Sequence, residues 1–228
     1  MDLHRWLSLY EVIRSDFGFS RHRDEKAAAL LDMLLAGKRD GFEELGGLFR
    51  GSTVYVIAPG PRVRGEIEEL RTVLDHSVTV AADAALDIML ESGLEPNAVF
   101  TDLDGAGSLL KRFRGLQVIH AHGDNMDLLF SLVPRIDAPI IGTVQVRPRG
   151  RTRVLGGFTD GDRAVSAACW LGARRVVLVG WDLDAQEYFK PGRRVNTLVK
   201  AKKLGWARRI LEILASEGCR VEGPGVYD

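Results

Sequence analysis

Short apolar runs rich in β-branched residues alternate with helical stretches along most of the chain, and this alternation restricts the fold more than any other feature. Near-continuous apolar strands separated by helices are typical of a parallel sheet that is covered on both faces. We therefore expect an α/β fold with a mainly parallel, doubly wound, Rossmann-like sheet. The predicted strands are 53–58, 77–81, 98–101, 117–121, 139–142 and 175–180. Apolar residues at helical spacing predict helices at 63–74, 84–92, 105–112, 126–133, 160–171 and 198–216.

The first fifty residues are expected to form a separate helical segment. Leu3, Leu7 and Tyr10 keep helical spacing, and Asp24 is placed to cap a second helix. No group of catalytic residues stands out there, so residues 1–50 are interpreted as a packing or dimerisation layer. A dimerisation layer would make the protein a homo-oligomer. Residues 51–228 are expected to form the α/β catalytic domain with its C-terminal helix.

Composition and charge exclude several classes of protein. The 31 basic residues balance the 31 acidic residues, so bulk charge gives no argument for binding nucleic acid or an anionic membrane. The N-terminus has an early acidic residue and no unbroken apolar core, and the apolar runs are too short to cross a bilayer. Cys169 and Cys219 lack metal-binding or redox spacing, so we expect free thiols in a reducing cytosol. These features predict a cytoplasmic protein with small-molecule partners.

Aspartates follow four of the predicted strands at their carboxyl ends, where ligands bind in open parallel sheets. Turns and helix caps favour aspartate and would explain any one of them, but six at one edge suggest a common use. Clustered carboxylates repel one another unless a cation neutralises them, and oxygen ligands favour a hard ion such as Mg²⁺. A metal-bound polyphosphate is therefore expected. The six residues are Asp83, Asp102, Asp104, Asp124, Asp182 and Asp184.

Two motifs at strand ends sharpen this expectation. In TDLDG (101–105), the D-x-D spacing places Asp102 and Asp104 on one side of the chain as metal ligands, and Gly105 permits a sharp turn. In HAHGDN (120–125), His120 and His122 share one face of an extended chain. No third soft ligand is nearby, so hydrogen bonding to substrate or to the aspartates is favoured over zinc or copper binding. Asn125 is expected to cap the next helix.

Glycine and arginine motifs offer candidate phosphate contacts. In GGFTDGDRA (156–164), Gly156 and Gly157 precede a helix start whose N–H groups can cradle a phosphate, with Arg163 one turn inside; a plain loop capped by Thr159 or Asp160 is the alternative. The alternating arginines at 147, 149, 151 and 153 suit a flap that closes on triphosphate, or equally a solvated hairpin. In APGPR (58–62), Gly60 permits a tight turn, but the missing glycines argue against NAD binding.

These motifs together resemble the archaeal 6-hydroxymethyl-7,8-dihydropterin diphosphokinase family over residues 50–185. The resemblance rests on ADAA at the strand end 81–85, and on TDLDG, HAHGDN, GGFTDGDRA and GWDLD. Family members carry ADGA where this chain has ADAA, and a GxGPSL-like loop where it has APGPR, so the detail of that loop differs. The family is distantly similar to thiamine diphosphokinases and to bacterial flagellin-modification proteins.

The resemblance implies Mg²⁺-dependent transfer of diphosphate from ATP to the pterin hydroxymethyl group with release of AMP, a step of tetrahydromethanopterin or folate biosynthesis. It assigns Asp102 and Asp104 to metal, and Asp83 and Asp124 to metal-bound water or the substrate hydroxyl, one of them as general base. The phosphates would contact Arg163, Arg147, Arg149, Gly60, Gly156 and Gly157. The implied substrate-binding residues are His122, Asn125, Asp160, Asp162 and Asp182.

Three alternatives remain at this point. A thiamine diphosphokinase would use the same chemistry on another acceptor. A nucleotide-sugar glycosyltransferase would use D-x-D to bind metal and diphosphate, and would need a nucleotide sugar without releasing AMP from ATP. A non-catalytic nucleotide-binding module would bind ATP tightly without turnover.

Overall fold

The computed structural model describes residues 2–107, 109–184 and 197–223. Within them, eight parallel strands form one sheet in the order β6-β5-β4-β3-β2-β1-β7-β8. The predicted α/β fold with a mainly parallel sheet is therefore confirmed. The strands are β1 (Thr53–Ile57), β2 (Val78–Ala82), β3 (Ala98–Thr101), β4 (Leu116–Ala121), β5 (Ile140–Val144), β6 (Thr152–Arg153), β7 (Arg175–Val179) and β8 (Val221–Glu222). The edge strands β6 and β8 were not predicted, because two residues are too few to produce a pattern.

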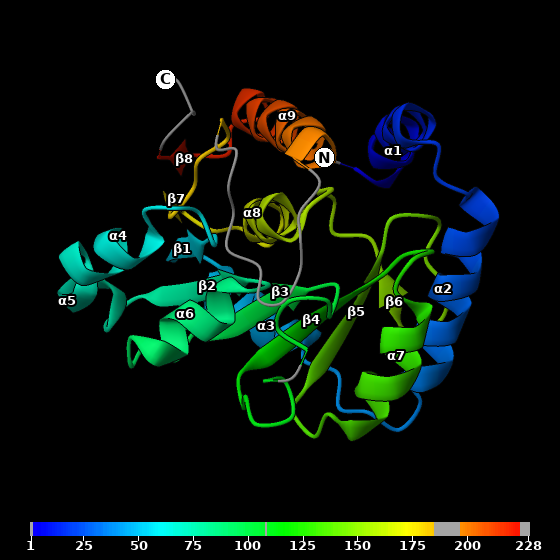
Figure 1. The fold of residues 1–228 in the computed structure, drawn as a ribbon, viewed down its shortest axis with the longest axis horizontal. Coiled ribbons are helices and arrows are strands. Elements are labelled where there is room, and N and C mark those ends of the chain that lie inside the picture. The colour runs from blue at the N-terminus through cyan, green and yellow to red at the C-terminus, as the bar shows by residue number, and fades with distance from the viewer. Residues whose placement is uncertain (1, 108, 185–196, 224–228) are drawn as a thin grey trace.

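Helices cover both faces of this sheet (Figure 1). Helix α8 lies on one face against β1, β2, β3 and β7, with α9 packed outside it, and α6 lies on the other face. The chain order reverses between β1 and β7, which is the topological switch point of the sheet. The helices are α1 (Leu3–Phe17), α2 (Arg21–Leu34), α3 (Phe42–Phe49), α4 (Val63–Glu69), α5 (Arg71–Leu74), α6 (Ala85–Glu91), α7 (Met126–Leu132), the 3-10 helix η1 (Val133–Arg135), α8 (Asp160–Trp170) and α9 (Thr197–Ser216).

Two local predictions about helices were wrong. The described residues at 105–112 form turns instead of a helix, because the backbone N–H groups of Gly105 and Ala106 donate to the Asp83 carboxylate. Helix α2 is capped by Ser20, whose hydroxyl accepts from the Arg23 N–H, and Asp24 lies inside its first turn. The Asp24 side chain is buried and contacts the loop after β4 instead.

The prediction of free thiols is corrected by a disulfide between Cys169 and Cys219, whose Cα atoms lie 5.6 Å apart. Cys169 stands near the end of α8, and Cys219 follows α9. The packing of α9 on α8 brings the two residues together, so their separation of fifty positions in the chain carried no sign of the bond. In the part of the chain that the structure describes, no helix is long and apolar enough to cross a membrane.

Candidate active site at the carboxyl ends of the strands

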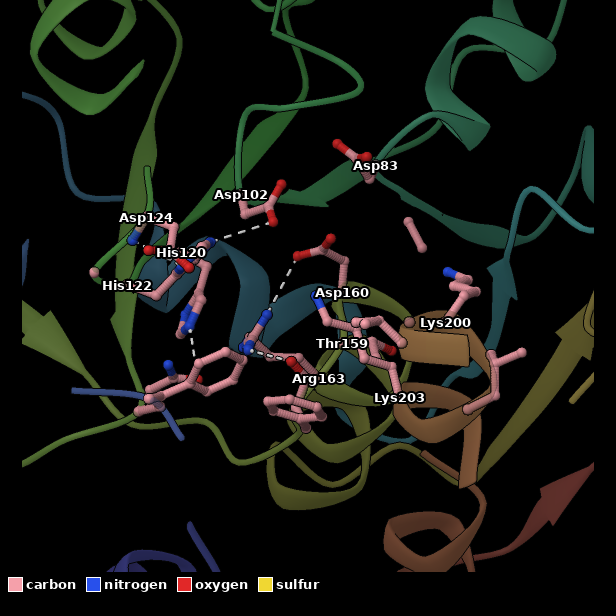
Figure 2. Close-up of a pocket in the computed structure, with 18 of the residues that line it drawn as sticks. Asp83, Asp102, His120, His122, Asp124, Thr159, Asp160, Arg163, Lys200 and Lys203 are labelled. Carbon is pink, nitrogen blue, oxygen red and sulfur yellow. Dashed lines mark hydrogen bonds and ion pairs between the residues drawn. The ribbon is translucent and has the colours of Figure 1, made fainter. Parts of the chain in front are cut away.

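A cavity of about 510 Å³ opens at the carboxyl edge of the sheet. Its walls come from the loops after β1, β2, β3 and β4, from the start of α8, from the turn between α1 and α2, and from α9. Figure 2 shows acidic side chains on one side of this cavity and lysines of α9 on another. The labelled residues are Asp83, Asp102, His120, His122, Asp124, Thr159, Asp160, Arg163, Lys200 and Lys203.

Three of the predicted aspartates form what we call the three-carboxylate group, made of Asp83, Asp102 and Asp104. One oxygen from each lies within 4.8 Å of the others. Asp83 follows β2, whereas the other two follow β3, its neighbour in the sheet, so the parallel pairing brings them together. Oxygen-only donors at this spacing fit a hard divalent cation such as Mg²⁺.

The TDLDG turn wraps closely around Asp83. Its Oδ1 accepts hydrogen bonds from the Thr101 hydroxyl at 2.7 Å and from the Gly105 and Ala106 N–H groups at 3.1 Å each. A Cβ on Gly105 would lie 2.0 Å from Asp83 Oδ2, so only glycine permits this approach. Asp83 and Leu103 both have positive φ, at 47° and 77°, which non-glycine residues seldom adopt. This strained backbone fixes the Asp83 carboxylate in place.

Asn125 ties the loops after β3 and β4 together. Its side-chain amide donates to the carbonyls of Asp102 at 2.8 Å and His120 at 2.7 Å, and its oxygen accepts from the His122 N–H at 3.0 Å. Asn125 occupies the N-cap position of α7 but makes no side-chain cap hydrogen bond. It does not line the cavity, so the structure places it as a support for His122, whose Nε2 lies 3.4 Å from Asp102 Oδ2.

His120 is buried in the cavity wall. Its Nδ1 lies 3.1 Å from the Thr143 hydroxyl and its Nε2 lies 3.4 Å from Gln145 Oε1. Burial, followed by the nearby Arg163 charge, lowers the pKa of His120 well below 6.5. The imidazole is therefore neutral at pH 7 and acts as a hydrogen-bonding group.

The buried His120 should make folding stability sensitive to acid. Because its pKa is lower in the folded state, the unfolded chain binds more protons below pH 6.5, and stability falls as the pH drops through that value. Each pH unit below 6.5 should cost up to about 1.4 kcal/mol. Urea unfolding at pH 7.5, 6.5 and 5.5 tests this: His120→Gln should lose less stability than the unmodified protein. A His76→Gln control, at an exposed position, should keep the full loss.

At the start of α8, two aspartates take different positions. Asp160 faces the cavity and accepts from Arg163 Nη1 at 3.2 Å. Burial, followed by the Asp102 and Asp83 charges, raises the pKa of Asp160. Asp162 instead forms a capping box, with its carboxylate accepting from the N–H groups of Phe158 at 2.6 Å and Thr159 at 2.7 Å. Asp162 therefore shapes the loop from inside the fold and does not line the cavity.

The three glycines predicted to contact phosphate have packing roles. Gly156 and Gly157 have φ of 73° and 77°, and a Cβ on Gly157 would lie 2.1 Å from Arg163 Cα. Gly60 donates its N–H to the Gly180 carbonyl at 3.0 Å, and a Cβ there would lie 2.1 Å from the same oxygen. None of the three lines the cavity, whereas Ala58 and Pro59 do.

The alternating arginines do not form one face toward the cavity. Arg151 donates to the carbonyls of Leu35 and Lys38, both at 2.7 Å, and Arg153 pairs with Asp40 at 2.6 Å. Arg147 and Arg149 are exposed and lie outside the cavity. The hairpin interpretation is wrong because β6 pairs with β5 in parallel.

Two more acidic residues were expected at the site. Asp124 lies at the rim, where its carboxylate is 3.2 Å from Arg23 Nη2. Asp182 accepts from the Asp184 N–H at 3.1 Å and does not line the cavity. Arg163, by contrast, is 3% exposed and donates to the carbonyls of Gly157 and Phe158 as well as to Asp160.

Sequence reasoning missed two parts of the cavity wall. The turn between α1 and α2 and the first turns of α9 both reach it, although neither carries a recognisable motif. Helical spacing indicated which α9 residues pack in the core, and the lysines between them were consistent with a solvated face. The missed residues are Phe19, Ser20, Arg23, Asp24, Lys200 and Lys203.

Comparisons with known proteins point in one direction. A family described as 6-hydroxymethylpterin diphosphokinase MptE-like matches residues 29–187. The chain is 38% identical to a protein of Pyrococcus furiosus, covering 96% of each chain, and 34% identical to one of Methanothermobacter thermautotrophicus, covering 96% of this chain and 97% of the other. A third relative, from Methanocaldococcus jannaschii, is 28% identical over 94% of this chain and 96% of its own. All three bear the name 6-hydroxymethyl-7,8-dihydropterin pyrophosphokinase.

Among solved structures, the fold is similar to that of the MAf glycosyltransferase from Magnetospirillum magneticum. The TM-score is 0.53 at 16% sequence identity, over 91% of this chain and 36% of the other. At this identity the likeness concerns the fold alone.

Proposed function

The chain belongs to the MptE-like 6-hydroxymethylpterin diphosphokinase family, and from this premise we propose how its cavity performs diphosphate transfer. The protein is a 6-hydroxymethyl-7,8-dihydropterin diphosphokinase, a diphosphotransferase. The observation that supports placing the reaction in this cavity is the three-carboxylate group, of which Asp83 and Asp102 line the cavity and Asp104 lies beside them, so that a cation and a polyphosphate can meet there. ATP as donor, Mg²⁺ as cofactor, a cytoplasmic location and a role in tetrahydromethanopterin or folate biosynthesis are further parts of the proposal.

In the proposed reaction, the hydroxymethyl oxygen of the pterin attacks the β-phosphorus of ATP. The bond from that phosphorus to the oxygen bridging it to the α-phosphorus breaks, and AMP leaves with the bridging oxygen. The hydroxyl proton passes to a carboxylate of the cavity. Because little covalent chemistry falls to the protein, catalysis depends on positioning the two substrates and neutralising charge.

The three-carboxylate group fits Mg²⁺ by its donor chemistry. Oδ1 of Asp83 already accepts three hydrogen bonds, so its Oδ2 is the oxygen suited to a cation, together with carboxylate oxygens of Asp102 and Asp104. Bound there, Mg²⁺ would neutralise phosphate charge. With Oδ1 taken by hydrogen bonds and Oδ2 assigned to the cation, Asp83 would have no oxygen left for the hydroxyl proton. Asp24 accepts from the Gly123 N–H and the Tyr10 hydroxyl, so Asp124 and Asp160 remain as the cavity carboxylates suited to take the hydroxyl proton, with Arg163 orienting Asp160.

Positive charge for the phosphates comes from α9 in this proposal. Lys200 and Lys203 line the cavity, unlike Arg147 and Arg149. Lys203 Nζ lies 6.0 Å from the Phe158 ring centroid, and within the described residues it forms no ion pair. A long cationic side chain at the cavity wall suits a triphosphate.

The Lys203→Ala variant should raise the KM for ATP at least about tenfold, since a charge-assisted contact contributes about 1.5–3 kcal/mol. The matched control lies one position earlier on the same helix: Lys202 pairs with Asp16 Oδ1 at 2.8 Å, outside the cavity. Lys202→Ala should leave the KM for ATP within about twofold of normal, given how little a surface ion pair contributes. Equal effects in steady-state assays of the two variants would contradict the assignment.

The reaction itself is tested by product analysis. The purified protein is incubated with ATP, Mg²⁺ and 6-hydroxymethyl-7,8-dihydropterin, and the products are identified by mass spectrometry. AMP and pterin diphosphate should form in equal amounts, and chelation of Mg²⁺ should stop both. ADP as the nucleotide product, or AMP formed only with another acceptor, would refute the proposed chemistry.

A further inference from the structure

The three-carboxylate group divides the cavity into two ends of different character. On one side, toward β4 and β5, the wall contains aromatic and hydrogen-bonding side chains, and we call this the corner end; it is lined by Phe19, Ser20, His120, Gln145 and Phe158. On the other side, toward β1 and β7, small apolar side chains and one indole form the switch-point end, lined by Ala58, Pro59, Ala82, Ala84 and Trp181.

The corner end combines flat apolar faces with buried polar groups. The rings of Phe19 and Phe158 lie 6.3 Å apart between centroids, and the ring of Phe17, which does not line the cavity, lies 5.1 and 5.2 Å from them. His120 and Gln145, 3% and 4% exposed, supply an imidazole and a carboxamide at the same end. His120 Nε2 lies 3.4 Å from Gln145 Oε1 and so orients the carboxamide, which also carries two N–H donors.

This chemistry matches the pterin ring. A pterin has flat faces and an edge that carries an amino group, a ring N–H and a carbonyl oxygen. Aromatic walls bind such faces by stacking, and the edge requires partners that both accept and donate hydrogen bonds. The switch-point end offers few polar side chains and lies where nucleotides bind in open α/β sheets. It therefore suits the adenosine part of ATP.

The N-terminal helices also contact the corner end through buried polar groups. The Asp24 carboxylate is 3% exposed and accepts from the Gly123 N–H at 2.8 Å and from the Tyr10 hydroxyl at 2.5 Å. Trp6 Nε1 donates to the Gln145 carbonyl at 3.2 Å. A Cβ on Gly123 would lie 2.6 Å from Arg23 Cβ, so only glycine lets this loop approach α2 so closely. These buried polar contacts join α1 and α2 to the loops that carry the site.

We propose that the corner end binds the pterin ring, with Phe19 and Phe158 stacking on its face and the Gln145 carboxamide, held by His120, contacting its edge, while ATP lies toward the switch-point end. The N-terminal helices thus build the acceptor subsite in addition to packing against the sheet. This inference rests on the proposed function, because it assigns the two substrates of that reaction to opposite sides of the three-carboxylate group.

The test measures the two substrates separately in the Phe19→Ala variant. Binding of 6-hydroxymethylpterin is followed by its fluorescence, without ATP, and the KM for ATP is measured by AMP release. Stacking of a base on an aromatic ring typically accounts for about a tenfold change in affinity or more. Phe19→Ala should therefore weaken pterin binding about tenfold and change the KM for ATP less than twofold. Phe17→Ala removes a ring of the same aromatic cluster that does not line the cavity. It should change pterin binding and the KM for ATP by less than about threefold each.

A second variant guards against a purely structural effect. Gln145→Leu removes the carboxamide but keeps the backbone carbonyl that Trp6 contacts, and it should weaken pterin binding at least tenfold with a normal KM for ATP. A raised KM for ATP with unchanged pterin binding in either variant would overturn the proposed orientation, as would no change in either quantity. Failure of the proposed function is a separate result: the unmodified protein would bind the pterin without forming its diphosphate, or would not bind it at all.

Discussion

The Asp104→Asn variant should lose at least about 100-fold in turnover, the typical loss when one charge-stabilising group is removed from an active site. Asparagine keeps the size of the side chain and one oxygen, but it removes one negative charge from the three-carboxylate group. The remaining carboxylates then hold a divalent cation less tightly. The Mg²⁺ concentration that gives half-maximal activity should therefore rise as well.

The fold should not suffer from this change. Without a cation, three carboxylates within 4.8 Å repel one another, so removing one charge should leave the thermal stability of the metal-free protein equal or higher. Circular dichroism melting in the presence of a chelator measures this directly. An Asp104→Asn variant that is well folded and nearly as active as the unmodified protein would refute the metal assignment.

The chain supplies its own matched control for this experiment. The residues Asp182, Leu183 and Asp184 repeat the D-L-D sequence of the TDLDG turn at the end of β7. Asp184 is exposed and pairs with Arg208 at 2.8 Å, and neither aspartate of this second motif belongs to the three-carboxylate group. Asp184→Asn should therefore keep activity within about twofold, as expected when only a surface ion pair is lost. A comparable loss in both variants would mean that the position of Asp104 is not special.

The acidic floor of the cavity could be predicted because it follows from topology. Parallel strands deliver their carboxyl ends to one edge, so any residue that directly follows an apolar strand is placed there by the strand itself. Asp83 and Asp102 were found in this way, and so was His122. The same reasoning cannot tell which of the two D-L-D motifs lies in the site, because that depends on where the preceding strand sits in the sheet. Strand β3 is central, whereas β7 lies beyond the switch point.

Which polar side chains turn toward the ligand depends on local hydrogen bonds that a motif does not reveal. Asp160 and Asp162 stand two positions apart, yet one faces the cavity and the other caps its own helix. The Asn125 side chain likewise forms its hydrogen bonds with backbone groups and not with a ligand. Aspartate and asparagine bind exposed backbone groups as readily as ligands, so a motif rich in them mixes both uses.

The N-terminal contribution could not be predicted because it consists of contacts between distant parts of the chain. Asp24 has the sequence context of a helix cap, and its actual partner, Gly123, lies about a hundred positions away. Lys202 and Lys203 are neighbours of the same type, and only the packing of α9 decides which of them reaches the cavity. Such choices are made by tertiary packing, on which local spacing carries no information.

The second large effect concerns the disulfide between Cys169 and Cys219. Replacing both cysteines with alanine should lower the free energy of unfolding by about 4 kcal/mol, the value expected for a cross-link that closes a loop of fifty residues. The loop contains β7 and α9, and its two ends are the last turn of α8 and the turn that precedes β8. The bond restricts the unfolded chain most, since the folded state already holds α8 and α9 together by packing.

Urea unfolding with and without a thiol reductant gives this prediction an internal control. The reductant should destabilise the unmodified protein by nearly as much as the double replacement does, and it should have no effect on the Cys169→Ala, Cys219→Ala variant. Equal unfolding free energies for the unmodified protein under both conditions would contradict the bond. Because α9 also carries Lys203 to the cavity wall, the KM for ATP tests whether the disulfide affects the active site as well. If packing alone positions α9, the KM for ATP should be the same in the oxidised protein and in the variant, and the disulfide then acts on stability only.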